Sequence, residues 1–191
     1  MTLRMAATVL SMSLAVPAVS FAQGSNGYKV LATNKTATMQ KEMQDAAAAG
    51  YRFAAVMGGE TSFGGSEVVV LMQTPASKEG RFEYRLLATS KTSTLQKELQ
   101  AAADAGFDYI GQTVFRSTFG GSEVAVILEK NTAASSRQHY EYTLIATSKT
   151  STLQKELDEV SEQGYEALGM TVGQTALGGS ELVVIARRPR R

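Results

Sequence analysis

The sequence predicts an α+β protein of three tandem βαββ repeats, each with one helix on a three-stranded antiparallel sheet of strand order 1-3-2. Three observations support this prediction. A segment of 47 residues occurs three times, which indicates a repeated structural unit. Within it, apolar residues first alternate as in a strand and then recur at helical spacing. A Gly-Gly pair then separates two further strand segments, as in a hairpin.

The repeats align without internal gaps and are joined by short polar linkers. Repeats 2 and 3 are identical at 24 of 47 positions, and all three agree at 15. The aligned segments are Tyr28–Thr74, Tyr84–Lys130 and Tyr142–Arg188. Ser, Ala, Gly and Pro between them are typical of exposed linkers. We therefore divide the chain into a signal peptide (1–22), repeat 1 (23–74), repeat 2 (82–130) and repeat 3 (140–191), with linkers at 75–81 and 131–139.

The first 22 residues have the features of a secretory signal peptide. Arg4 precedes an apolar stretch over residues 5–16, and Ser20 and Ala22 place small residues at the −3 and −1 positions of a cleavage site. The stretch is too short to span a bilayer, which needs ~20 apolar residues. We expect cleavage after Ala22, with an uncleaved anchor as the alternative. A small exported chain without cysteine indicates a periplasmic or secreted bacterial protein.

Each repeat opens with a strand and continues into an amphipathic helix. In repeat 2, Tyr84 and Leu86 lie on one face of the predicted strand. Leu95, Leu99 and Ala102 follow at i, i+4 and i+7, which places them on one apolar stripe of a helix. We expect polar residues to cap each helix start and glycine to end each helix. The expected caps are Ser93 with Gln96, Ser151 with Gln154, and Thr36 or Thr38; the expected terminators are Gly50, Gly106 and Gly164.

The last strand of each repeat belongs in the centre of its sheet. Val124–Leu128 and Leu182–Ala186 are apolar throughout, as in strands that are buried on both faces. The pairs Gly64-Gly65, Gly120-Gly121 and Gly178-Gly179 before the last strands predict two-residue hairpin turns. A unit of 47 residues buries little surface alone. We therefore expect the repeats to pack their helices and sheets together, with approximate three-fold symmetry.

Short motifs in each repeat resemble a known domain family. Repeat 3 has an aromatic residue two positions before Tyr142, the run Glu-Gln-Gly-Tyr-Glu at 162–166, and an apolar strand ending in Arg187-Arg188. These features resemble a small bacterial βαββ domain family of unknown function, with a Y-K-V, G-W-E and basic-residue pattern. Residues 104–108 and 50–52 follow the pattern more loosely. The resemblance implies a βαββ fold and no activity.

Composition and motifs exclude most catalytic sites. The chain has no cysteine, and His139 is its one histidine, which excludes thiolate and His-rich sites. Thr94 and Lys97 have the spacing of a Ser-x-x-Lys motif, but Thr replaces Ser and the partner motifs are missing. We predict no catalytic residue, no metal site and no cofactor. Nineteen basic and 18 acidic residues give no signal for nucleic acid.

The helix starts are the one candidate binding site that recurs in all three repeats. Lys and Thr side chains there would surround free backbone N–H groups, which is the composition of an anion site. A structural role is the alternative, because every helix start needs polar groups. The candidate residues are Lys35, Thr36, Thr38, Lys91, Thr92, Thr94, Lys149, Thr150 and Thr152.

These observations favour an exported, non-enzymatic binding or structural module. Its partner would be a protein or a polyanion, and residues 187–191 form a basic segment that could contact an anionic surface. The alternative is a small-ligand or anion-binding protein, or an enzyme, that uses clefts between repeats. A deep pocket joining a residue equivalent to Lys97 in one repeat with a residue equivalent to Glu123 in another would favour that alternative, because folding within one repeat explains neither position.

Overall fold

The structure is a computed structural model that describes residues 27–61, 65–75, 80–116, 122–135, 138–174 and 179–190. The expected signal peptide and most of the Gly-Gly turns lie outside these residues. The described elements are β1 (Tyr28–Thr33), α1 (Thr36–Ala48), β2 (Arg52–Thr61), β3 (Gly65–Gln73), β4 (Phe82–Thr89), α2 (Thr92–Asp104), β5 (Asp108–Arg116), β6 (Ser122–Asn131), β7 (Tyr140–Thr147), α3 (Thr150–Glu162), β8 (Glu166–Gln174) and β9 (Ser180–Pro189).

Each repeat forms its own antiparallel sheet, and the predicted α+β fold is confirmed. The strand orders are β1-β3-β2, β4-β6-β5 and β7-β9-β8, so the last strand of each repeat is central. Val126, Ile127 and Leu128 of β6 are fully buried, because side chains on both faces of a central strand have apolar neighbours. The second strand of each repeat carries one register shift, next to Ala54, Ile110 and Leu168 respectively.

The helices end as predicted but begin differently. Gly50, Gly106 and Gly164 have φ values of 91°, 85° and 84°, which glycine adopts without a Cβ clash. The predicted capping boxes are wrong. The N-cap residues are Lys35, Lys91 and Lys149, with no side-chain cap hydrogen bond, and Ser93 and Ser151 lie inside their helices. Their partners Gln96 and Gln154 make other hydrogen bonds.

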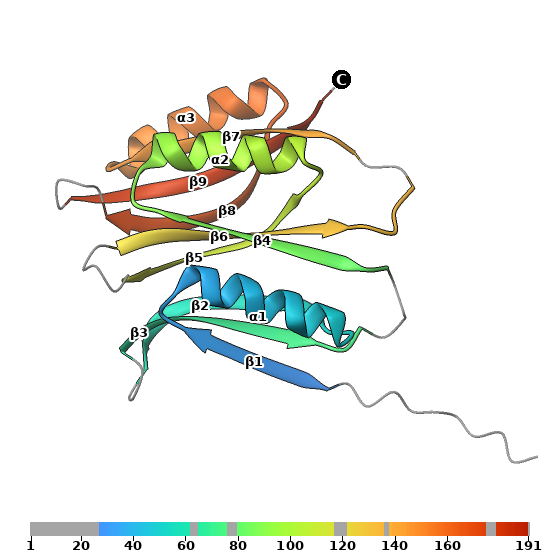
Figure 1. Cartoon of the computed structure of the whole chain (residues 1–191). Coiled ribbons are helices and arrows are strands. Elements are labelled where there is room, and N and C mark those ends of the chain that lie inside the picture. The colour runs from blue at the N-terminus through green and yellow to red at the C-terminus, as the bar shows by residue number, and fades with distance from the viewer. Residues whose placement is uncertain are drawn as a thin grey trace, which may run out of the picture.

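The repeats pack as a stack of alternating sheets and helices (Figure 1). Helix α1 lies between its own sheet and β4 of the next repeat, and α2 lies likewise between its own sheet and β7. The β2 strand also contacts β5, and β5 contacts β8. Among the described residues, every extensive contact between repeats joins repeats 1 and 2 or repeats 2 and 3. The three repeats therefore follow one another along the stack, with repeat 2 in the middle.

The apolar cores are shared between consecutive repeats. The first core contains Met39 and Met43 of repeat 1 together with Tyr84 and Ile127 of repeat 2. The second joins the helix and sheet of repeat 2 to the sheet of repeat 3 in the same way. The third is small and belongs to repeat 3 alone, because no other repeat in the described part of the chain covers α3. No helix in the described part of the chain is long and apolar enough to cross a membrane.

Candidate functional site

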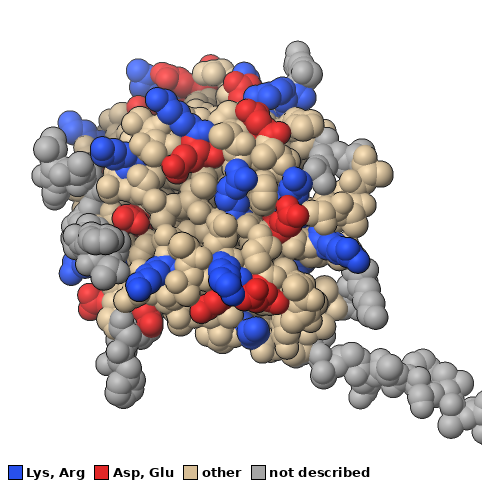
Figure 2. All heavy atoms as spheres, viewed as in Figure 1, with Lys and Arg blue, Asp and Glu red and all other residues tan. Residues whose placement is uncertain are grey.

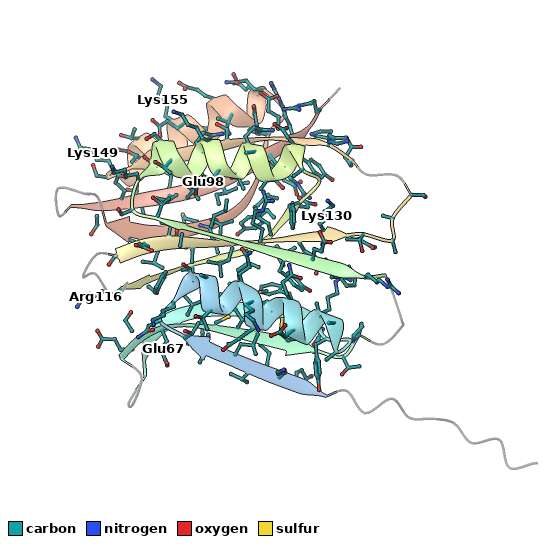
Figure 3. The ribbon with its side chains drawn as sticks, in the orientation of Figure 1. Glu67, Glu98, Arg116, Lys130, Lys149 and Lys155 are labelled. Carbon is teal, nitrogen blue, oxygen red and sulfur yellow. The ribbon has the colours of Figure 1, made fainter. Side chains whose placement is uncertain are left out.

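The three helix starts lie on the same side of the stack and have exposed lysines. Each N-cap backbone N–H donates to the threonine hydroxyl two residues earlier, as Lys35 N does to Thr33 Oγ1 at 3.2 Å. Figure 3 shows Lys149 at the start of α3, pointing away from the body of the molecule. Lys35, Lys91 and Lys149 are all exposed, and the threonines beside them are exposed or half-buried. The structure thus places the nine predicted residues as three separate surface groups.

The surroundings of these starts are not a positive field. Figure 2 shows Lys and Arg side chains interspersed with Asp and Glu over the face in view. A cavity of about 460 Å³ between α2 and α3 has Thr92 on its rim together with the carboxylates of Glu156 and Glu159. One carboxylate oxygen of Glu156 is buried without a hydrogen-bond partner. Carboxylates at this position disfavour a bound anion, because like charges repel.

Lys97 and Glu123 do not form a joint site. Lys97 is exposed on α2, and Glu123 is half-buried near the start of β6. The lysines equivalent to Lys97 pair within their own helices, Lys41 with Asp45 at 2.8 Å and Lys155 with Glu159 at 3.6 Å. The cavity between α2 and α3 contains neither Lys97 nor Glu123.

On both α1 and α2, a pair of glutamines forms hydrogen bonds with the edge strand of the next repeat. Leu86 N of β4 donates to Gln40 Oε1 at 2.9 Å, and Gln44 Nε2 donates to Tyr84 O at 2.8 Å. On α2, Gln96 and Gln100 bind β7 with the two roles exchanged: Gln96 Nε2 donates to Tyr142 O at 2.9 Å, and Tyr142 N donates to Gln100 Oε1 at 3.0 Å. Unpaired backbone groups on an edge strand are templates for aggregation, and these glutamines satisfy them.

A buried tyrosine and an ion pair close the interface between repeats 1 and 2. Tyr84 is 1% exposed and donates its hydroxyl hydrogen to Glu129 Oε2 at 2.9 Å, while Phe53 N donates to the tyrosine oxygen. Arg52 of β2 binds Glu129 of β6 with both Nε and Nη2, the latter at 2.8 Å. Arg52 also lies over the Phe82 ring, 4.2 Å from its centroid. The Arg–carboxylate pair is bidentate and thereby fixes the relative position of the two repeats.

The interface between repeats 2 and 3 contains the same network with the charges exchanged. Asp108 stands at the position of Arg52, and Arg187 stands at the position of Glu129. Arg187 and the Tyr142 hydroxyl both donate to Asp108, and Tyr109 N donates to Tyr142 Oη at 2.9 Å. The C-terminal arginines therefore pair within the chain: Arg188 binds Glu141 and Arg190 binds Asp104.

Burial of the interface tyrosines predicts a loss of stability at alkaline pH. Burial raises the pKa of Tyr84 and Tyr142, and it raises the pKa of Tyr109 to about 12. Because the folded state holds these protons more tightly, the free energy of unfolding is unaffected below pH ~10 and falls above it. A Tyr109→Phe variant should fall less steeply above pH ~10, by up to about 1.4 kcal/mol per pH unit, reduced where solvent reaches this half-buried ring. Urea unfolding at pH 8, 10 and 11 measures both slopes, and parallel slopes would contradict the prediction.

Glycines let the sheets approach each other closely at both interfaces. A Cβ on Gly58 would lie 2.0 Å from the Val114 carbonyl oxygen of the next sheet. A Cβ on Gly169 would lie 2.0 Å from the Tyr109 hydroxyl oxygen, and one on Gly111 would lie 3.0 Å from the Phe53 ring. The opposing atom at Gly58 belongs to the backbone, so a residue with a Cβ does not fit there, whereas a Cβ at Gly169 or Gly111 would displace the facing ring.

The stack leaves one apolar surface open at each end. At the first end, no other described segment covers the face of β1-β3-β2 opposite α1, and Tyr28, Val30 and Met57 are 63%, 64% and 62% exposed. At the other end, Met170 and Val172 of β8 are 62% and 56% exposed beside α3. These surfaces were not predicted from the sequence, because the pattern of one repeat does not show which of its faces a neighbouring repeat covers.

Among the described residues, no group of His, Cys, Asp and Glu side chains could hold a metal ion. Comparisons with family models, curated proteins and solved structures found no match for this chain.

Proposed function

We propose that the protein is an exported, non-enzymatic binding or structural module that acts through the open ends of its stack. The observation that supports this most directly is the uncovered apolar face of β1-β3-β2. Tyr28 is 63% exposed there, whereas the equivalent Tyr84 and Tyr142 are 1% and 3% exposed under a neighbouring repeat. Exposed apolar surfaces of this kind are typical of protein–protein contacts.

Site-specific photocrosslinking tests this function. A photoreactive residue at Met57 should form a crosslink to a protein that mass spectrometry can identify, because this side chain lies on the open face. The same residue at Lys97, which is exposed on the polar side of α2, is the matched control. Equal crosslinking at the two positions, or none at Met57, would contradict the proposal.

Export predicts a processed N-terminus. The apolar stretch at 5–16 and the Ser20-x-Ala22 site support removal of residues 1–22 by a signal peptidase. N-terminal sequencing of the protein recovered from outside the cytoplasm of a bacterial host should begin at Gln23. Recovered protein that still begins at Met1 would contradict cleavage and would favour the anchor.

A further inference from the structure

The two open ends are the two halves of the interface that occurs twice inside the stack. In both internal interfaces, the helix and second strand of one repeat cover the outer sheet face of the next. In the part of the chain that the structure describes, repeat 3 presents the covering half without a repeat to cover, and repeat 1 presents the covered half without a cover. The side chains at the two ends can therefore be compared position by position with those of the internal interfaces.

Packing volume is matched between the two ends. Inside the stack, a large ring always lies opposite a glycine: Phe53 opposite Gly111, and Tyr109 opposite Gly169. The residue of repeat 3 equivalent to the two rings is Ala167, and the residue of repeat 1 equivalent to the two glycines is Ala55. Both alanines are exposed. A small residue thus replaces the ring at one end, and the opposite position gains a methyl group at the other.

The hydrogen-bonding groups of the ends also match. Inside the stack, two helix side chains four residues apart bind the edge strand of the next repeat. At the equivalent positions on α3, Gln154 and Asp158 are exposed and bind each other at 2.8 Å. The equivalent acceptor on β1, an edge strand, is the Tyr28 carbonyl, and the equivalent donors are the N–H groups of Tyr28 and Val30. Gln154 Nε2 can donate to the Tyr28 carbonyl as Gln96 does to that of Tyr142, and Gln154 Oε1 can accept from Val30 N as Gln40 does from Leu86 N. The Asp158 carboxylate can accept from Tyr28 N, as Gln100 does from Tyr142 N.

The polar network can form across the ends as well. Glu166 stands at the position of Arg52 and Asp108, and Gln73 stands at the position of Glu129 and Arg187. Glu166 and Gln73 are both exposed. A carboxylate there would accept hydrogen bonds from the Gln73 amide and from the Tyr28 hydroxyl, as Asp108 does from Arg187 and Tyr142. Only one of these three groups carries a charge, so no like charges would meet within this network.

We propose that a second copy of this chain binds there, so that the α3 and β8 end of one copy docks on the open β1-β3-β2 face of the next. This proposal rests on the proposed function, because it names the partner of the open ends. Head-to-tail contacts of this kind form rings or open filaments, depending on the rotation per step. The contact would continue the stack with a fourth repeat of the same design.

Complementary blocking of the two ends tests the proposal on the protein lacking residues 1–22. Val30→Asp blocks the first end, and Met170→Asp blocks the other; both side chains are exposed, so both variants should keep the far-UV spectrum and melting temperature of the wild type. In sedimentation equilibrium, we expect the wild type to gain mass with concentration and each variant alone to stay monomeric. An equimolar mixture of the variants should form a dimer, because it contains one intact contact.

Three results would overturn the proposal. A wild type that stays monomeric at protein concentrations up to about 1 mM, the dissociation constant of a very weak contact, would exclude self-association. A dimer of Met170→Asp alone would mean that two open sheet faces bind each other. Crosslinks from Met57 only to other proteins, with monomeric purified protein, would overturn the second copy as partner and leave the proposed function standing.

The polar network gives a second test with matched charges. Gln73→Arg would place an arginine opposite Glu166, as Arg187 lies opposite Asp108, and should tighten the dissociation constant by about tenfold. Gln73→Glu would place a carboxylate opposite that of Glu166 and should raise the dissociation constant by a similar factor. Adding Glu166→Arg to Gln73→Glu would recreate the Arg52–Glu129 pair and should restore association. Equal dissociation constants for Gln73→Arg and Gln73→Glu would overturn the predicted register.

Discussion

Replacing Leu99 by alanine should lower the free energy of unfolding of the whole chain by about 2–5 kcal/mol. Leu99 is fully buried in the core that α2 shares with the sheet of repeat 3. The change removes apolar contacts with both repeats and leaves a cavity between them. Because the core is shared, urea and thermal unfolding should remain one transition at lower denaturant concentration and temperature.

Leu157 provides the matched control within the same chain. It occupies the position of Leu99 in repeat 3, but it is only half-buried, because no further repeat among the described residues covers α3. Leu157→Ala should therefore cost the monomer roughly half as much or less, in proportion to the apolar area that it buries. Equal losses for the two variants, or an isolated repeat 3 as stable as the full chain, would contradict the shared core.

Replacing Gly58 by alanine should destabilise the protein by about 3 kcal/mol, the upper end of the usual cost of overpacking. The new Cβ would lie 2.0 Å from the Val114 carbonyl oxygen, and this atom belongs to the backbone of the facing sheet. A backbone carbonyl in a paired strand cannot rotate away as a side chain can, so the two sheets must separate. Urea unfolding of the variant measures the loss.

Gly59 is the control for this substitution. It is the next residue of β2, and a Cβ there would meet nothing within 4 Å. Gly59→Ala should change the free energy of unfolding by no more than about 0.5 kcal/mol, as exposed substitutions usually do. A large loss at Gly59, or a small one at Gly58, would show that the sheets are not in the close contact described.

Periodicity and repetition are sufficient to predict the fold within each repeat. The alternation of Tyr84 and Leu86, the helical stripe of Leu95 and Leu99, and the apolar run of the last strand all describe local patterns. Sheet order followed from the apolar last strand, because only a central strand is buried on both faces. The positive φ of the three terminating glycines was predictable for the same local reason.

The helix starts show where local reasoning failed. Ser93 and Gln96 have the spacing of a capping box, but Gln96 Nε2 binds the Tyr142 carbonyl of the next repeat instead. The need to satisfy an edge strand in another repeat determined the role of this side chain, and no pattern within one repeat contains that information. Retention of Gln40, Gln96 and Gln154 across repeats was the available signal.

The polar networks at the two interfaces could also be predicted in part from the sequence. Arg52 and Glu129 of one interface become Asp108 and Arg187 in the next, so two positions exchange charge together between repeats. Such a paired exchange indicates spatial contact, because a single change would leave a half-buried charge without a partner. The sequence does not show, however, which repeat packs against which.

Amide hydrogen exchange at two equivalent strand positions tests the central claim. This claim is that each repeat covers the sheet and the edge strand of the next repeat, and that the two open ends bind each other between copies. Leu86 N donates to Gln40 Oε1 of the preceding repeat, and Val30 N is its equivalent on the open edge of β1. We predict slow exchange at Leu86 at every protein concentration. At Val30 we predict fast exchange in dilute protein, with protection appearing as the concentration rises and being lost in Met170→Asp. Exchange at Val30 that does not depend on concentration, or exchange at Leu86 as fast as at Val30 in dilute protein, would contradict the claim.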